Sequence, residues 1–266
     1  MPTRAVLVIP CYNEMARLDR AEFGRFLEAE PRIDLIFVND GSTDRTALVL
    51  DELHLANASR ITAHSLPRNR GKAEAVRQGV LLGLAGTWDY VGYWDADLST
   101  PLNVCSQWID VLDGRSEIDW LFGSRIRLLG HSVERRALRH VAGRFFATAA
   151  SMTLGLPVYD TQCGAKLFRR TDLATALFSE PFLSRWVFDV ELLARVLAEH
   201  RGAPNGRRFP VCEMPLDEWR DVGGSRLGVI HMLRAGVDLI RIAADMRIRE
   251  RRATKRPSLA VNPIQH

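Results

Sequence analysis

The stretch DYVGYWDADLSTP, residues 89–101, contains the features that decide the fold. It begins with a short apolar run, which is typical of a buried β-strand. Asp95 and Asp97 follow one residue apart, and turn-forming residues come directly after them. If the strand continues to Asp97, its alternating side chains place both carboxylates on the same side. Such a pair either binds a cation or faces water as turn residues, and this stretch alone leaves both alternatives open.

The same succession of an apolar run and a helical pattern recurs along the chain. Strands are predicted at residues 5–10, 33–40, 60–65, 89–95 and 119–124. Helical spacing of apolar residues is found between them, at residues 21–28, 43–54, 72–84 and 101–112. This alternation predicts an α/β fold with a mostly parallel central sheet flanked by helices. Ligands of such sheets bind outside the carboxyl ends of the strands, near the switch in strand order.

Polar segments gather at these predicted strand ends, which indicates one binding edge. They are residues 10–14, 39–44, 67–72, 95–99 and 123–125. Ser99 and Thr100, followed by Pro101, are expected to cap the next helix, as are Ser42 or Thr43 for an earlier one.

Composition is that of a globular protein and excludes several classes of function. Of 266 residues, 47% are hydrophobic and 26% are charged, which argues against a disordered or fibrous chain. The four cysteines are scattered without a CxxC pair, so neither a zinc site nor a disulfide framework is supported. No GxGxxG follows the first strand and no GxxxxGK[ST] is present, which argues against a dinucleotide-binding oxidoreductase or a P-loop enzyme. The N-terminal residues read as a first strand and not as a signal peptide, so a cytoplasmic protein is expected.

Two basic segments lie in the second half of the chain. Residues 125–144 contain six arginines and one acid, and residues 241–256 contain seven Lys or Arg and two acids. Both segments are therefore expected to bind anions. Residues 226–252 are predicted to form an amphipathic helix, which packs its apolar stripe on the domain or rests on an anionic membrane surface. That stripe consists of Ile230, Leu233, Val237, Ile240, Ala244 and Ile248.

The opposite side of this predicted helix is charged, and two pairs have the spacing of helical ion pairs, Arg234 with Asp238 and Arg241 with Asp245. The expected organisation is a catalytic domain at residues 1–225, the helix at 226–252 and a disordered tail at 253–266. A peripheral position on the inner face of the membrane remains an alternative to a freely cytoplasmic one. The oligomeric state is left open.

Eight motifs in order resemble the family-2 glycosyltransferases of GT-A fold. They are PCYNE (10–14), NDGSTD (39–44), NRGKAEAVRQG (69–79), WDADLS (94–99), GSR (123–125), DTQCGAKLFRR (160–170), RWVFDVELL (185–193) and EWRDVGGSRL (218–227). Within that family the chain is most similar to the dolichyl- or polyprenyl-phosphate sugar synthases, especially the dolichyl-phosphate β-glucosyltransferase branch. The similarity extends over roughly residues 4–250.

The resemblance implies an inverting, metal-dependent transfer of a hexose to a polyprenyl phosphate, with glucose from UDP-glucose as the expected donor among UDP- and GDP-hexoses. It assigns Mg²⁺ or Mn²⁺ to Asp95 and Asp97, and the acceptor phosphate to Arg125 and Arg139. Asp97, Arg125 and Asp189 are the catalytic candidates. The donor-binding candidates are Pro10, Tyr12, Glu14, Asp40, Lys72, Asp95, Ala96, Asp97, Ser225 and Arg226.

The chemistry agrees with this assignment. Hard divalent cations favour carboxylate and phosphate oxygens, and a bound cation would neutralise the leaving nucleoside diphosphate. A phosphate acceptor is largely dianionic at neutral pH, so it needs arginines and not a general base. The alternative is a hydroxyl acceptor, for which Asp189 would be the base. A nucleic-acid-binding module is disfavoured, because the basic segments lack interleaved aromatic residues.

The sequence departs from the family pattern at four positions. Asn39 stands where many relatives have an aspartate, and Ser99 where mannosyl-type relatives often place a glutamine ligand. Ala73 replaces a common glycine, and Arg226 replaces lysine. The role of Asn39 in reading the base and the identity of a third metal ligand are therefore open.

Overall fold

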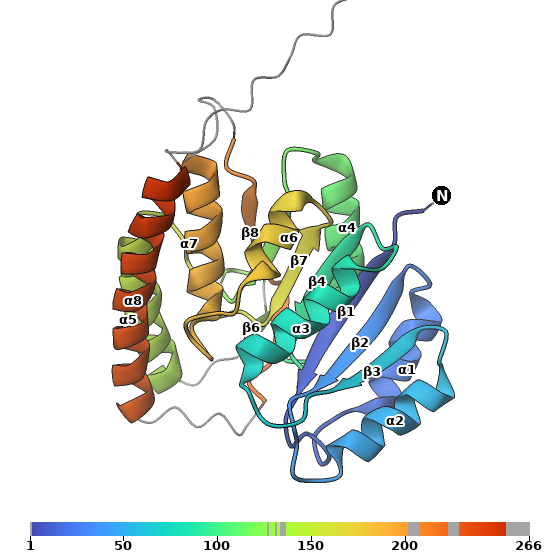
Figure 1. The fold of residues 1–266 in the computed structure, drawn as a ribbon. Helices are drawn as coiled ribbons and strands as arrows, with labels where there is room; N and C mark the ends of the chain where they lie inside the picture. The colour runs from blue at the N-terminus through green and yellow to red at the C-terminus, as the bar shows by residue number, and fades with distance from the viewer. Residues whose placement is uncertain are drawn as a thin grey trace, which may run out of the picture.

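The computed structural model describes residues 2–126, 128–130, 132–133, 137–201, 208–222 and 229–253. Within them a seven-stranded sheet has the order β3-β2-β1-β4-β7-β5-β8, and it forms the centre of the molecule (Figure 1). Its strands are β1 (Ala5–Cys11), β2 (Ile33–Asn39), β3 (Ile61–Ser65), β4 (Tyr90–Trp94), β5 (Trp120–Ser124), β7 (Ala165–Arg169) and β8 (Val211–Pro215). The short strands β6 (Ser132–Val133) and β9 (Glu218–Trp219) pair separately.

All five predicted strands are present, and the predicted mostly parallel sheet is confirmed. β3, β2, β1 and β4 run parallel, whereas β7 is antiparallel to both β4 and β5. The strand order reverses at β1 and β4, so the segments after these two strands meet at the switch point where such sheets bind ligands.

The sheet is buried on both faces, which explains the continuous apolar runs of its central strands. Along β1, Leu7 and Ile9 belong to one core cluster, and Val6 and Val8 belong to the other. The first face is covered by α1 (Arg20–Ala29), α2 (Thr46–Ala56) and α4 (Val104–Gly114). The second is covered by α3 (Lys72–Leu84), α6 (Asp172–Ser179) and α7 (Phe188–Arg201).

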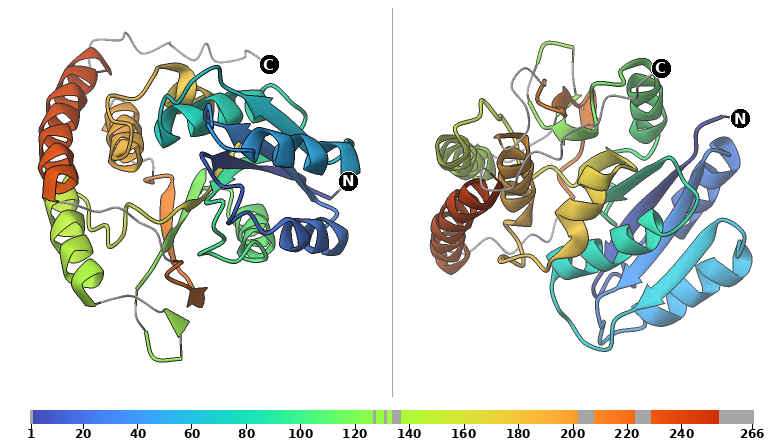
Figure 2. Two further views of the ribbon diagram at one scale, coloured as in Figure 1. Left: turned by 90° about the horizontal axis from the view of Figure 1, so that it is seen from below. Right: turned by 45° about the horizontal axis from the view of Figure 1, so that its top comes forward.

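Two long helices form an outer layer on α7. They are α5 (Ala137–Leu154) and α8 (Val229–Ala253), which contact each other and α7. In Figure 2 this layer lies on the side of α7 that is turned away from the sheet. Among the described residues, no helix has an apolar stretch long enough to cross a membrane.

The predicted helix caps are wrong. α4 begins at Val104 and not at Pro101, after an N-cap residue without a side-chain hydrogen bond. The segment before it is held in another way, since the indole Nε1 of Trp94 donates to the carbonyl of Thr100 at 3.0 Å. α2 begins at Thr46, and the amide of this residue donates to the Asp44 carboxylate at 2.9 Å.

The face by which α8 packs on the domain also differs from the prediction. Leu239, Ile242 and Met246 are the buried residues. Val237, Ile240 and Ile248, from the predicted stripe, are exposed, as is Ala244. The side chains of Ile230 and Leu233 lie outside the described residues. Where its side chains are described, α8 therefore has two apolar faces, of which the one with Leu239, Ile242 and Met246 is buried and the other is exposed.

Tertiary contacts decide the ion pairs of α8. Asp238 pairs with Arg241 at 3.6 Å and accepts from the Ser184 hydroxyl at 2.6 Å. Asp245 pairs with Arg249 at 2.5 Å, and the same guanidinium reaches Glu180 before α7. The two predicted pairs are thus replaced by others within α8, and Asp238 and Arg249 also attach the helix to the rest of the domain.

Candidate active site

Asp95 and Asp97 lie in a turn and not on a strand. β4 ends at Trp94, so the predicted continuation of the strand to Asp97 is wrong. The turn is tight, since Leu98 adopts a left-handed conformation with φ of 53°. The Ser99 amide donates to the Asp97 carboxylate at 3.0 Å, and the Asp95 amide donates to the Gly164 carbonyl at 3.0 Å. The turn thus presents both carboxylates at the carboxyl edge of the sheet.

Lys72, the first residue of α3, forms an ion pair with Oδ1 of Asp95. Burial opposes the charge of this lysine, but the nearby carboxylates of Asp95 and Asp189 hold its pKa above the usual value. The structure therefore brings together two predicted donor-site residues from the ends of different elements.

Asp40 holds the segment that leads to Lys72. Its carboxylate accepts from the amides of Arg70 at 2.7 Å and Gly71 at 2.8 Å, and the residue is buried. Gly71 has φ of 95°, a conformation that side chains other than glycine rarely adopt. In these contacts Asp40 orders the start of α3, and its predicted role in donor binding stays a prediction.

β7 brings a further segment to the site, in which the sequence analysis named no site residue. Trp94 at the end of β4 pairs with Ala165 at the start of the antiparallel β7. A Cβ atom on the preceding residue, Gly164, would lie 1.9 Å from Oδ2 of Asp95. The backbone at Gly164 is thus packed directly against the carboxylate. The signal was present in the sequence, because this glycine belongs to the motif DTQCGAKLFRR.

Asp189 is part of a buried network. Its Oδ1 lies 2.7 Å from Nζ of Lys166 and accepts a hydrogen bond from the Tyr93 hydroxyl. Lys166 also donates to the carbonyl of Cys163 at 2.6 Å. Burial and the charge of Asp189 raise the pKa of Tyr93 well above its usual value, so the phenol keeps its proton. Sequence reasoning named Asp189 but missed both partners.

Arg125 is engaged with a carboxylate. It donates to Asp160 through Nε at 2.6 Å and Nη2 at 2.8 Å, and its guanidinium lies over the Trp219 ring at 5.3 Å. Burial opposes its charge, but Asp160 raises the pKa of Arg125. An acceptor phosphate would therefore share this guanidinium with Asp160. Arg139, the second predicted phosphate ligand, belongs to α5, but its side chain lies outside the described residues.

The segment after β1 lies at the same edge of the sheet, next to the turn after β4. Tyr12 is exposed there, and Pro10 is the partly buried residue near the end of the strand. Glu14 is buried and accepts from Arg17 through Nε at 2.9 Å and Nη2 at 2.5 Å. Burial, with the charges of Asp97 and Asp95, raises the pKa of Glu14 although Arg17 opposes this.

Side-chain hydrogen bonds hold the neighbouring loops. Asn13, with φ of 54°, accepts from the Thr43 amide at 2.9 Å. Asn39, the departure from the family pattern, donates to the Ser65 hydroxyl at 3.2 Å and accepts from the Ser42 amide at 3.0 Å. The buried Asn39 therefore has a local structural role.

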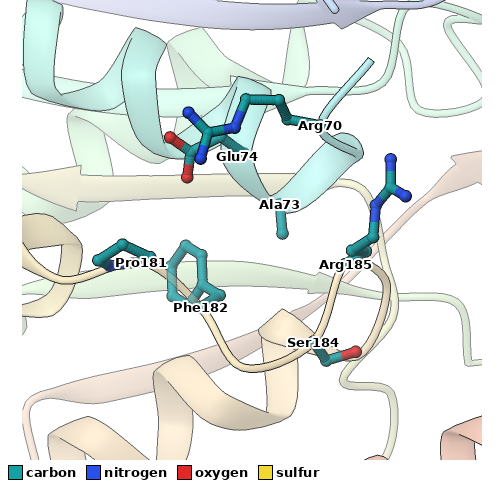
Figure 3. Close-up of a pocket in the computed structure, with 7 residues that line it drawn as sticks. All are labelled: Arg70, Ala73, Glu74, Pro181, Phe182, Ser184 and Arg185. Carbon is teal, nitrogen blue, oxygen red and sulfur yellow. The ribbon is translucent and has the colours of Figure 1, made fainter. Parts of the chain in front are cut away.

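A pocket of about 130 Å³ lies beside the start of α3 and not over the carboxylate turn. Figure 3 shows the Arg70 guanidinium next to the Glu74 carboxylate on one side of the pocket, with Arg185 on the other side of Ala73. The seven lining residues are Arg70, Ala73, Glu74, Pro181, Phe182, Ser184 and Arg185.

In the described residues, no group of three or more His, Cys, Asp or Glu side chains is arranged to hold a metal ion. Asp95 and Asp97 therefore have no third side chain of these types arranged with them in the described residues, and Ala96 between them is buried. Ser225 and Arg226, predicted to meet the donor phosphates, lie outside the described residues.

Comparison with known proteins shows the family of the chain. The model of the family described as Glycosyl transferase family 2 matches residues 6–175. A dolichyl-phosphate beta-glucosyltransferase of Trichomonas vaginalis is 32% identical over 248 residues, covering 89% of this chain and 69% of that protein. The dolichyl-phosphate beta-glucosyltransferase of Homo sapiens is 29% identical over 261 residues, which cover 90% of this chain and 75% of that protein.

Among solved structures, the fold matches glucosyl-3-phosphoglycerate synthase from Mycobacterium tuberculosis in complex with Mn²⁺, UDP-glucose and phosphoglyceric acid. The TM-score is 0.63 at 18% identity, over 92% of this chain and 79% of that one. The predicted GT-A fold and the resemblance to the dolichyl-phosphate β-glucosyltransferases are thereby confirmed. From the motifs, the sheet and these relatives together, we conclude that the chain is a glycosyltransferase and belongs to glycosyl transferase family 2.

Proposed function

We propose that this glycosyltransferase transfers glucose from UDP-glucose to a polyprenyl phosphate, with inversion at the sugar and with a divalent cation at Asp95 and Asp97. The observation that carries the proposal is the carboxylate turn after β4, at the switch point of the sheet. Relatives similar over about nine tenths of the chain are named for transfer of glucose to dolichyl phosphate, which supports both the sugar and the acceptor class.

The residues at the turn fit a divalent cation. Two carboxylates offer the hard oxygen ligands that Mg²⁺ and Mn²⁺ prefer, and the diphosphate of the donor with water would complete the coordination. The ammonium of Lys72 forms an ion pair with Asp95. The Asp95 carboxylate therefore already stabilises a positive charge at this position. When bound, the cation would supply Lewis-acid stabilisation of the leaving diphosphate. Lys72 would add charge on the same side, with Ser225 and Arg226 as further donor contacts.

The contacts of Asp189 favour a phosphate acceptor over a hydroxyl acceptor. A general base must accept the proton of its substrate directly or through one water. The buried carboxylate of Asp189 is instead fastened to Lys166 and Tyr93. A phosphate dianion needs no such base. Arg125, aligned by Asp160, and Arg139 remain the proposed cations for the acceptor phosphate.

We further propose that the outer surface of α5 and α8 rests on the cytoplasmic face of an anionic membrane, where the lipid acceptor is found. Phe145 and Met152 of α5 are 73% and 79% exposed, and Ile240 of α8 is 72% exposed. Arg241 and Arg247 are exposed on the same helix. Apolar side chains with arginines among them suit the boundary between headgroups and acyl chains.

A panel of UDP- and GDP-hexoses, with Mn²⁺ or Mg²⁺ and with or without a short polyprenyl phosphate, tests the reaction through nucleotide release. We expect release above hydrolysis only with a glucose donor, a cation and the lipid phosphate. Unchanged activity after chelation would contradict the metal assignment, and equal turnover with a simple alcohol would contradict the acceptor class.

Flotation with anionic and with neutral vesicles tests the surface. We expect salt-sensitive binding to the anionic vesicles only, weakened in Ile240→Ser. Leu55→Ser is the matched control, because Leu55 is an equally exposed apolar residue on the distant α2.

A further inference from the structure

The Asp95 carboxylate is enclosed from two directions. Its Oδ1 forms the ion pair with Lys72. On the side of Oδ2, the backbone at Gly164 is so close that a Cβ atom there would lie 1.9 Å away. The Asp95 side chain is still about a third exposed, so a divalent cation that binds this carboxylate competes for it with the Lys72 ammonium.

The surroundings explain why a lysine stands there. Asp95 and Asp97 are near enough to Glu14 for their charges to act on it. Three carboxylates at one edge repel each other, and each lacks full hydration. The Lys72 ammonium reduces this repulsion. The backbone from which its side chain extends is held in place, because the Asp40 carboxylate binds the amide of Gly71 directly before it.

We propose that Lys72 is the resident counter-ion of Asp95 and exchanges with the divalent cation, so that the cation binds tightly only together with a nucleoside diphosphate. This inference rests on the proposed metal-dependent function and concerns the order in which its parts assemble. The diphosphate is essential to it, because the displaced ammonium needs another anion.

The side chains around Lys72 support this exchange. The charges of Asp189 and Asp97 also act on Lys72. Oδ1 of Asp189 already binds Lys166 and Tyr93, and Asp97 belongs to the turn that would hold the cation. The Lys72 side chain is a quarter exposed, and four flexible methylenes allow the ammonium to turn toward a phosphate. The donor would thus bring both the remaining cation ligands and the new partner of Lys72.

Mn²⁺ titration followed by electron paramagnetic resonance measures the exchange without turnover. We expect Lys72→Gln to bind Mn²⁺ alone about tenfold more tightly than the wild type, since a like charge beside the ion is removed. UDP should raise the Mn²⁺ affinity of the wild type strongly and that of Lys72→Gln by a smaller factor. By linkage, Mn²⁺ should change the affinity for UDP by the same two factors.

Two further variants serve as controls. Lys72→Arg keeps the charge and should retain the weak Mn²⁺ binding of the wild type without UDP. Arg70→Gln removes an exposed cation two residues away, whose guanidinium lies by Glu74, and should leave Mn²⁺ binding unchanged. Thermal unfolding confirms that each variant is folded.

The outcomes separate the two ideas. Equal Mn²⁺ affinity of Lys72→Gln and the wild type, with an unchanged effect of UDP, would overturn the exchange but leave the metal site standing. Absence of Mn²⁺ binding in both proteins even with UDP would overturn the metal-dependent function and the exchange with it. If Lys72→Gln does not fold, Lys72→Met and Lys72→Arg carry the same comparison.

Discussion

The ammonium of Lys166 lies 2.7 Å from Oδ1 of Asp189, and both side chains are buried. The pair joins β7 to the first turn of α7, and the Tyr93 hydroxyl adds β4 to the same oxygen. Three elements that reach the active-site edge are thus fixed by one carboxylate. A buried charge is stable only while its partner remains, so this pair should control the stability of the site.

Lys166→Met should destabilise the protein by about 3–5 kcal/mol, because Asp189 would stay buried without its counter-ion. The double variant Lys166→Met with Asp189→Leu should recover much of that loss, since neither charge is then left unpaired. Urea denaturation of the wild type, the two single variants Lys166→Met and Asp189→Leu, and the double variant gives the coupling free energy between the two side chains. Equal losses in the single and the double variant would contradict this role.

Asp189→Asn tests whether this carboxylate is a general base. If it fixes α7, the variant should unfold more easily but retain turnover with polyprenyl phosphate within about tenfold at a temperature where it is folded. A lost general base would cost roughly 10²–10⁴ in rate. Single-turnover rates with the lipid phosphate, measured after circular dichroism confirms folding, distinguish the two roles.

Gly164→Ala should lower activity far more than stability. The added Cβ atom would meet the Asp95 carboxylate, so the carboxylate must turn away and the cation loses a ligand. We expect at least a hundredfold lower kcat/KM, or about 2.7 kcal/mol, measured by nucleotide release at saturating Mn²⁺. Gly24→Ala is the control, because nothing lies within 4 Å of its Cβ position in α1, and alanine favours a helix.

The sequence predicts best those strands that are buried by apolar residues on both faces. β1, β2 and β4 are apolar on both faces, so their runs are continuous and easily recognised. β7 was missed because Lys166 interrupts its apolar pattern. That lysine is buried only because Asp189 comes to meet it from α7, and no local pattern contains this information.

The same limit applies to α8 and to the site. α8 offers two apolar faces at helical spacing, and contact with α7 selects the one that contains Leu239, Ile242 and Met246. At the site, motif resemblance named Asp40, Asp95 and Arg125, but their partners come from separate segments. The structure pairs them with the Gly71 amide, Lys72 and Asp160.

Glu74 links α3 to the pH dependence of stability. Its carboxylate accepts from Arg77 through Nε and Nη2 at 2.9 Å each, and from Gln78 at 2.8 Å. Burial alone would raise the pKa of Glu74, but these bonds hold it below the usual value of 4.5. The folded state therefore favours the ionised carboxylate, which stabilises the protein above pH 4.5 and ceases to do so as the pH falls through the lowered pKa.

Glu74→Gln should consequently reduce the free energy of unfolding by about 1.5–3 kcal/mol at pH 7, the range for a hydrogen bond to a charged group. The difference from the wild type should shrink as the pH falls below 4.5, because the wild type then loses the same charge. Urea denaturation of both proteins from pH 7 to pH 3.5 measures this difference, in which the contributions of all other acids cancel. Glu52→Gln is the control, since its ion pair with Arg20 is exposed and should contribute little at any pH. A difference that stays constant or grows toward low pH would contradict the assigned direction of the Glu74 pKa.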